Sequence, residues 1–259
     1  MGFQLEIYPD KKACGIAAGK MGAKKIKEAI DQNGEAFIII ATGASQFDML
    51  EELVTHDEID WAKVTMFHLD EYVGISDEHP ASFRKYIKER FIGRLPAGKN
   101  LKAAYLVDGS AADPAQVCKE LDALIKMNTI DVAFIGIGEN GHIAFNDPPA
   151  DFDTEEAYLV VELDEVCRRQ QLGEGWFPTL DDVPKKAISM SPRQIMKSKC
   201  IINTVPDSRK AYAVKITVEG DLCPMHPASI VRIHPDCITY CDADSAADLS
   251  AITRDFCSK

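Results

Sequence analysis

The sequence predicts an α/β fold: a doubly wound, mostly parallel, Rossmann-like sheet with helices on both faces, in a single domain over residues 1–259. Short apolar runs rich in β-branched residues occur at residues 36–41, 64–69 and 132–135. Helical patterns lie between these runs. Because strands that alternate with helices at this spacing are joined by right-handed crossovers, the strands are expected to be parallel.

The individual elements follow from local patterns along the chain. Residues 10–32 are rich in small residues and lysines and end at Asn33 and Gly34, which predicts an amphipathic helix. The continuous apolar run at 36–41 is typical of a buried strand. We expect further helices at residues 47–54, 82–91, 192–196 and 208–218, and further strands at 64–69, 132–135, 158–162, 200–205 and 237–240.

Charge and cysteine content restrict the possible partners. The formal net charge is −12, without a basic block, so we expect neither nucleic acid nor an anionic membrane surface as a partner. No window approaches the roughly 18 apolar residues of a membrane span, and the first residues lack the pattern of a secretion signal. We therefore expect a cytoplasmic protein. The eight cysteines form no CxxC pair, which favours free thiols over a structural zinc site.

Residues 42–46 (TGASQ) connect a predicted strand to a predicted helix. Such a loop offers backbone donors and two hydroxyls at a helix N-terminus, which is the local chemistry of phosphate binding. Tight strand-to-helix turns use the same residue types for structural reasons alone, which is the alternative. The loop is not a P-loop, because no GKS or GKT follows it.

Asp70 and Glu71 follow the apolar residues 67–69, so at least one carboxylate is expected at a strand tip facing the crevice of the sheet. A partly desolvated carboxylate at that place can act as the general base for a carbon acid. A helix cap or a solvated surface pair is the alternative interpretation.

Residues 136–148 (GIGENGHIAFNDP) form a glycine-rich loop directly after the predicted strand at 132–135. His142 lies five residues before Asp147, so the loop can bring an imidazole and a carboxylate together, with Asn140 close by. This acid–base pair indicates an enzyme, whereas a structural or exposed histidine is the alternative. No second histidine or cysteine occurs at ligand spacing nearby, so we expect no metal site here.

Arg209 and Lys210 open the predicted helix at 208–218, near the end of another strand. A cation at this position can hold a phosphate group together with the loop at 42–46. The alternative is an exposed cationic pair, because most charged residues are solvated.

Four motifs together resemble those of the glucosamine-6-phosphate deaminases, also called isomerases, in the superfamily that includes 6-phosphogluconolactonases. They are residues 42–45 (TGAS), 67–74 (FHLDEYVG), 138–148 (GENGHIAFNDP) and 208–211 (SRKA). The similarity extends over nearly the whole chain. Lactonases typically differ in the two middle motifs, with DERxVP and a GHTASLFP-like run in their place.

The resemblance implies hydrolytic deamination and aldose–ketose isomerisation of glucosamine 6-phosphate, a phosphosugar, to fructose 6-phosphate and ammonium, without a cofactor or metal. It implies that His142, oriented by Asn140 and Asp147, opens the sugar ring, and that Asp70 moves the proton between the second and first carbons. The substrate-binding residues that we expect from it are Thr42, Gly43, Ala44, Ser45, Glu71, Gly138, Gly141 and Lys210.

The chain departs from the family pattern at three places. Asn140 stands where aspartate is frequent, and Asp147 replaces a glutamate and is one methylene shorter. The phosphate-binding arginine of the family has no counterpart in residues 173–177 (GEGWF), so we expect Arg168 or Arg169 to substitute for it.

Other functions are compatible with the same motifs. The substrate of a galactosamine-6-phosphate deaminase differs only in the configuration at the fourth sugar carbon, so the sequence does not distinguish this activity from that of a glucosamine-6-phosphate deaminase. A 6-phosphogluconolactonase and a non-catalytic sugar-phosphate sensor are more distant alternatives. The resemblance also implies a homo-oligomer.

Overall fold

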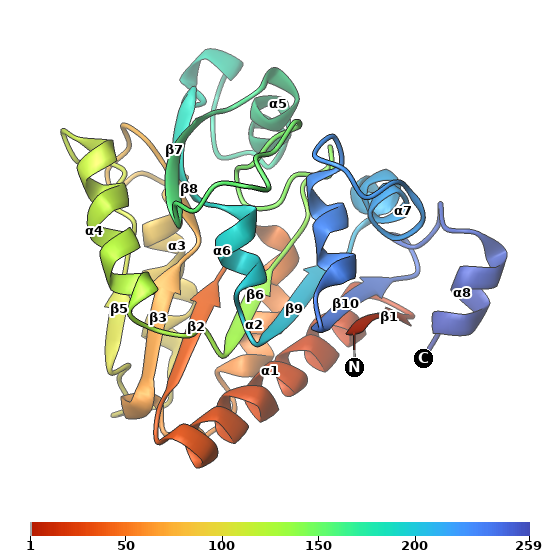
Figure 1. The fold of residues 1–259 in the computed structure, drawn as a ribbon, viewed down its shortest axis with the longest axis horizontal. Helices are drawn as coiled ribbons and strands as arrows, with labels where there is room; N and C mark the ends of the chain where they lie inside the picture. The colour runs from red at the N-terminus through yellow and green to blue at the C-terminus, as the bar shows by residue number, and fades with distance from the viewer. Residues whose placement is uncertain (1) are drawn as a thin grey trace.

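Seven parallel strands form the central sheet of the protein in a computed structural model that describes residues 2–259. In spatial order they are β1 (Gly2–Tyr8), β10 (Asp236–Asp242), β9 (Cys200–Val205), β6 (Val132–Ile135), β2 (Ala36–Ile40), β3 (Val64–His68) and β5 (Ala103–Tyr105). All neighbouring strands in this sheet run parallel (Figure 1). The predicted parallel architecture is therefore confirmed.

Helices cover both faces of this sheet. The helices of the described chain are α1 (Lys11–Asn33), α2 (Phe47–Leu53), α3 (Phe83–Arg90), α4 (Pro114–Lys126), α5 (Glu165–Gly173), α6 (Pro192–Met196), α7 (Ala211–Glu219) and α8 (Ala251–Cys257), of which α5 lies above the sheet and α8 beside its edge (Figure 1). Ile38 and Ile40 of β2 pack in one core cluster with α1, α2 and α3. Ile39, between them, packs in another cluster with α4 and α6. Since neighbouring strand residues point to opposite faces, the two clusters are the two sides of the sheet.

A second sheet of three antiparallel strands was not expected from the sequence. It has the order β4 (Asp70–Tyr72), β8 (Lys186–Met190) and β7 (Tyr158–Glu162), and Figure 1 shows β7 and β8 above the main sheet. The strand at 158–162 is confirmed, but it pairs in this sheet and has alternating burial rather than a fully buried run. Asp70, which was expected at the tip of the preceding strand, is the first residue of β4 in this second sheet.

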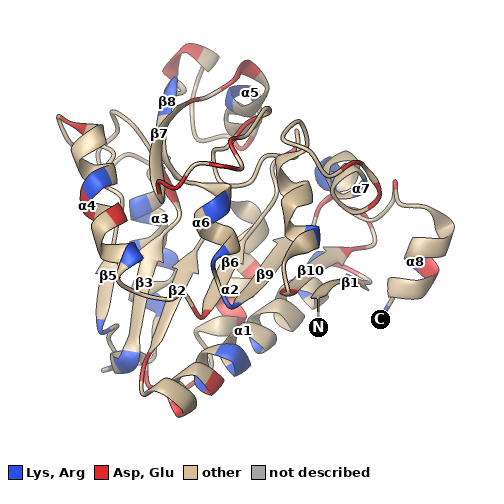
Figure 2. Cartoon of the chain, in the orientation of Figure 1, with Lys and Arg blue, Asp and Glu red and all other residues tan. Residues whose placement is uncertain are grey.

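Several further elements also escaped sequence reasoning, namely β1, β5, α4, α5 and α8. The two strands are the edges of the main sheet and are mostly half-buried, so neither has a continuous apolar run. Figure 2 shows lysine and arginine interspersed with acidic residues over α1 and α4. Within residues 2–259, none of the helices has the length and apolar character needed to cross a membrane.

The direction in which the chain crosses the sheet reverses between β2 and β6. From β2 the chain proceeds outward to β3 and β5, then returns to β6 on the other side of β2 and continues to β9 and β10. Loops that leave the carboxyl ends of such a strand pair diverge and create a crevice for ligands. The loops at 42–46 and 136–148 leave these two strands, so the topology places them on either side of that crevice.

Candidate active site

A cavity lies at this crevice and is lined by segments that follow β2, β3, β6 and β9. Eight of the residues expected at the site contribute to its wall: Thr42, Gly43, Ala44, Ser45, Asp70, Gly138, His142 and Lys210. They come from four regions separated along the sequence. The fold thus assembles one site from the separate motifs.

Asp70 lines the cavity although the residue is only 5% exposed. Within residues 2–259, its Oδ1 has no hydrogen-bond partner. Burial, together with the charge of neighbouring Glu71, raises the pKa of Asp70 well above its usual value. A carboxyl group with a raised pKa is a stronger base than an ordinary carboxylate and can both take up and return a proton, as a carbon acid requires.

Glu71 caps a helix and does not line the cavity, which corrects its expected place in the substrate-binding set. Its buried carboxylate accepts hydrogen bonds from Ser82 Oγ (2.8 Å) and from the backbone amides of Phe83 (3.1 Å) and Arg84 (2.8 Å). The first amides of a helix lack partners within the helix, so an acidic side chain at this end of α3 stabilises it. Burial raises the pKa of Glu71, although these hydrogen bonds oppose the rise.

The imidazole of His142 forms part of the cavity wall and lies directly against Gly138. A Cβ atom at Gly138 would lie 2.2 Å from atoms of that ring, so a larger residue would displace it. Gly141, with a φ of 87°, makes the tight turn in which its amide donates to the Gly138 carbonyl at 3.0 Å. Gly141 does not line the cavity itself and acts through the loop's shape.

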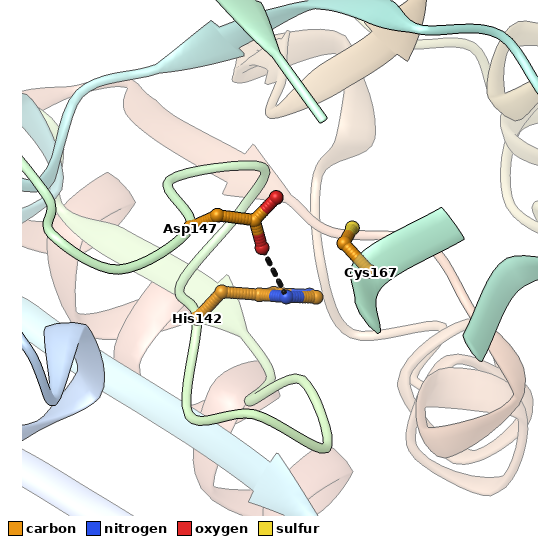
Figure 3. Close-up of side chains that lie close together, drawn as sticks. All are labelled: His142, Asp147 and Cys167. Atoms are coloured by element: carbon orange, nitrogen blue, oxygen red, sulfur yellow. Dashed lines mark ion pairs between the residues drawn. The ribbon is translucent and has the colours of Figure 1, made fainter. Parts of the chain in front are cut away.

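Asp147 holds the imidazole from one side. Its Oδ1 lies 3.1 Å from Nδ1 of His142 and accepts a hydrogen bond from Nδ2 of Asn140 at 3.0 Å. Its Oδ2 accepts a hydrogen bond from the amide of Asp164 at 3.0 Å. Figure 3 shows the ring edge-on with the carboxylate on one side of its plane, and Nδ1 has no hydrogen-bond partner in the described chain. The carboxylate is therefore close to the ring but not aligned with Nδ1.

The contacts of Asp147 determine its charge state. Burial acts to raise the pKa of Asp147, but the neighbouring imidazole and the hydrogen bonds that it accepts outweigh burial and lower the pKa. The carboxylate is thus ionised and can stabilise a positive charge on the ring. Asn140 also accepts a hydrogen bond from the amide of His142 at 3.0 Å, so the residue expected to orient the histidine contacts both members of the pair.

The loop that carries His142 is fixed to the second sheet. Asn146 is buried and its Nδ2 donates to the carbonyls of Ile143 and Met190, both at 2.8 Å. The amide of Phe145 donates to Ser189 Oγ at 3.0 Å. Because β8 supplies two of these partners, the unexpected antiparallel sheet serves to hold the histidine loop in place.

Lys210 and Arg209 form a cationic corner of the cavity. The Lys210 side chain is buried, and burial lowers its pKa. No carboxylate of the described chain forms an ion pair with its ammonium group. Arg209 instead pairs with Asp207 at 3.1 Å and Glu139 at 3.7 Å. A buried ammonium group without an ion-pair partner is suited to bind an anionic group of a ligand.

Neither upstream arginine reaches the cavity, which contradicts their expected placement. Arg169 is on the exposed side of α5, with 64% of its side chain exposed, and pairs with Glu165 at 2.5 Å. Arg168 donates to the backbone carbonyls of Leu180 and Val183. A helix turns by about 100° per residue, so Gln170 and Gln171 face the cavity while Arg169 faces away.

The sequence reasoning missed Gln170, Gln171 and Glu174 as cavity residues. They belong to α5 and its C-terminal end, a helix that the sequence analysis did not identify. Its buried positions are occupied by Cys167 and the two glutamines rather than by an apolar stripe. Hydrophobic periodicity, the main sequence signal for a helix, was therefore weak here.

Comparisons with known proteins agree with the motifs. Residues 9–239 match the family model described as glucosamine-6-phosphate isomerases/6-phosphogluconolactonase. The chain belongs to this family. Among similar family members, the glucosamine-6-phosphate deaminase of Oenococcus oeni is 34% identical over 91% of this chain and 95% of its own length. That of Exiguobacterium sibiricum is 36% identical over 87% of this chain and 86% of its own length.

Solved structures of the family have the same fold. A monomeric glucosamine-6-phosphate deaminase superimposes with a TM-score of 0.83 and 28% identity, covering 96% of this chain and 100% of that one. The 6-phosphogluconolactonase of Thermotoga maritima has a TM-score of 0.73 and 16% identity, covering 93% of this chain and 99% of that one. The second similarity concerns the fold alone, whereas the sequence relatives above are all named deaminases.

Proposed function

We propose that this protein is a glucosamine-6-phosphate deaminase, which converts glucosamine 6-phosphate and water to fructose 6-phosphate and ammonium. One observation carries the proposal: a single cavity contains Asp70 with a raised pKa, an imidazole beside an ionised carboxylate, and the buried ammonium group of Lys210. The deaminase relatives at 34% and 36% identity support this substrate over the lactone.

His142 is the group that opens the sugar ring in this proposal. Ring opening removes a proton from the anomeric hydroxyl and delivers one to the ring oxygen, and an imidazole can do both. Asp147 stabilises the imidazolium that exists between the two transfers, because its carboxylate is ionised and lies 3.1 Å from Nδ1. Asn140 holds that carboxylate in place.

Asp70 is the base for the isomerisation. It takes the proton from the second carbon of the open-chain sugar, which gives an enolamine, and returns a proton to the first carbon. Water then adds at the second carbon and the nitrogen leaves as ammonia, which is protonated to ammonium. The raised pKa of Asp70 suits this shuttle, because the same group must be both a base and an acid during one turnover.

The phosphate group is held away from the reacting carbons. Lys210 supplies the charge, and the loop of Thr42, Gly43, Ala44 and Ser45 lines the same cavity and supplies hydrogen-bond donors. Binding energy at this distant group orients the reacting carbons. Gly138 gives His142 its position, while Glu71 and Gly141 support the site from outside the cavity wall.

We also propose that residues 1–259 act as one domain, in the cytoplasm and as a homo-oligomer. The eight cysteines are all free, which is typical of a reducing compartment. The exposed apolar side chains of α8 support self-association, since Ile252 and Phe256 lie one turn apart and are 84% and 90% exposed. Sedimentation velocity of the purified protein tests this state directly.

The decisive experiment measures ammonium and fructose 6-phosphate released from glucosamine 6-phosphate by the purified protein. Galactosamine 6-phosphate and 6-phosphogluconolactone are assayed in parallel. We expect equal amounts of the two products from the first substrate and the highest kcat/KM for it. Preferential turnover of either other substrate would replace this proposal, and binding of the sugar phosphates without turnover of any would make the protein a sensor.

A further inference from the structure

Cys167 lies beside the His142 and Asp147 pair, on an element that the proposed reaction does not use. The cysteine belongs to α5, whereas the other two residues belong to the loop after β6. One donor atom from each of the three side chains lies within 4.8 Å of the other two (Figure 3). This arrangement joins segments that are far apart in sequence, which is why no ligand spacing was visible in the loop itself.

A nitrogen, an oxygen and a sulfur donor make a ligand set suited to zinc and related transition metals. Metal–ligand bonds of about 2.0–2.3 Å in a tetrahedral site place the donors about 3.3–3.6 Å apart. Nδ1 of His142 and Oδ1 of Asp147 are already 3.1 Å apart. A shift of the Cys167 side chain by about 1 Å would complete three corners and leave the fourth for water, by that same geometry.

An independent observation points to a ligand at this place. The imidazole of His142 is only 7% exposed, and its Nδ1 forms no hydrogen bond in the described chain, because Asp147 Oδ1 lies 3.1 Å away but out of line. A buried nitrogen whose hydrogen-bonding capacity is unused is unfavourable unless something binds it. A metal ion held jointly with Asp147 and Cys167 would satisfy it.

We propose that His142, Asp147 and Cys167 form a binding site for a divalent transition metal of the zinc type, and that its occupation inhibits the enzyme. On binding, the sulfur–hydrogen bond of Cys167 breaks, a sulfur–metal bond forms, and the proton passes to solvent. Two anionic ligands and a neutral imidazole then balance the charge of the ion. The inhibition rests on the proposed function, because the metal occupies the histidine assigned to ring opening.

The metal would also connect two walls of the cavity. Gln170 and Gln171 follow Cys167 on α5 and face the cavity, while His142 faces it from the loop. A metal bound to both segments fixes the helix to the loop. Zinc binding is therefore expected to slow hydrogen exchange at the backbone of α5 as well as turnover.

Cobalt(II) titration of the purified protein, followed by absorption, tests the site without reference to activity. We expect a thiolate-to-cobalt charge-transfer band that saturates at one ion per chain and disappears when zinc is added. Cys167→Ser should abolish the band. Cys118→Ser, a matched change of another buried cysteine on α4, should leave it intact.

His142→Gln is the second variant and retains the thiol. Its apparent zinc affinity should fall by more than the about 10–100-fold typical of losing only an outer-shell partner. Absence of a band in the unaltered protein, or an unchanged band in Cys167→Ser, would overturn the proposed site. Should Cys167→Ser fail to fold, unchanged zinc affinity in His142→Gln overturns it instead.

The deaminase assay separates the two proposals. With an active enzyme we expect zinc to inhibit turnover, a chelator to restore it, and Cys167→Ser to be at least about tenfold less sensitive, by the ligand-loss argument above. Normal turnover by an enzyme whose metal site is occupied by zinc would refute the proposal that zinc binding inhibits the reaction. A cobalt band in a protein without deaminase activity supports the metal site and rejects the proposed function.

Discussion

Asp70 and Asp147 are both screened from solvent at the same crevice, yet their surroundings shift their pKa values in opposite directions. Asp70 follows β3, its Oδ1 accepts no hydrogen bond in the described chain, and it lies next to the carboxylate of Glu71. Asp147 follows β6 and accepts hydrogen bonds from Asn140 and the amide of Asp164 beside the imidazole. Burial raises the pKa of Asp70, whereas the contacts of Asp147 overcome burial and lower its pKa.

This difference shows that polar partners, together with the deeper burial of Asp70, distinguish the two carboxylates. An isolated carboxyl group exchanges protons readily, which suits a shuttle between two carbons. A carboxylate that is held by hydrogen bonds stays ionised, which suits orientation of an imidazole. Two acids whose environments separate their pKa values are the usual basis for different roles at one site.

Asp70→Asn should have the largest effect on the proposed reaction. The amide keeps the size of the side chain but removes the proton-shuttling group, and such a loss typically lowers kcat by about 10²–10⁴-fold. Steady-state release of ammonium gives kcat and KM separately, and we expect KM to change little. Asp248→Asn, an exposed change of the same type, is the control, and retention of near-normal kcat in Asp70→Asn would refute the assignment of the base.

Gly138→Ala should reduce turnover by a smaller amount. The added methyl group would lie 2.2 Å from the imidazole of His142, so the ring must move from its place beside Asp147. A displacement of about 1 Å at a catalytic group can lower the rate by about 10²-fold. Gly173→Ala is the control, because its added methyl group meets no atom within 4 Å; equal rates in both variants would mean that the ring position is unimportant.

The pH dependence of folding stability separates the two carboxylates without an activity assay. The folded pKa of Asp70 is raised above the unfolded value of about 3.9, so the stability linked to its protonated form is complete below that pH and is lost as pH rises through the folded pKa. The asparagine side chain of Asp70→Asn does not titrate, so this variant lacks that loss of stability. Its free energy of unfolding should therefore rise relative to the unaltered protein as pH increases from about 4 toward the folded pKa of Asp70, by about 1.4 kcal/mol for each pKa unit of the shift.

Asp147→Asn should show the opposite sign in another pH range. The folded pKa of Asp147 is lowered, so its stabilisation is present above the unfolded value of about 3.9 and is lost as pH falls through the folded pKa. The deficit of Asp147→Asn should be present above about pH 5 and shrink as pH falls below that value, by the same linkage. Urea unfolding at several pH values measures both variants, and parallel curves for the two would contradict the comparison.

Much of the cavity could be predicted because its motifs lie directly after predicted strands. A parallel sheet gathers the carboxyl ends of its strands at one edge, so the apolar runs before Thr42, Asp70 and Gly136 placed these loops together. The helix cap made by Glu71 was also foreseen as an alternative for this acidic pair. Which of two adjacent carboxylates faces the cavity depends on the pairing of β4 with β8, and that pairing has no local signal.

The remaining part of the site depends on contacts between distant segments. Cys167 approaches the imidazole only because α5 packs beside the loop after β6. The glutamines of the same helix reach the cavity for this reason too, and the helix lacks the apolar stripe that would have indicated its buried side. Because α5 was not recognised in the sequence, the side of the helix on which each residue lies was unknown. The choice of Arg169 as a phosphate ligand therefore rested on its proximity in sequence alone.

Arg169→Ala should have the smallest effect of these changes. Its guanidinium is 64% exposed and bound to Glu165 on the same helix face, so its loss removes at most an exposed ion pair, which contributes about 0.3–0.5 kcal/mol. We expect KM for the sugar phosphate to be unchanged within error, whereas Lys210→Ala should raise KM by about 10–100-fold through loss of a charged hydrogen bond. A rise in KM for Arg169→Ala as large as that for Lys210→Ala would mean that α5 rotates on substrate binding and brings the arginine to the phosphate.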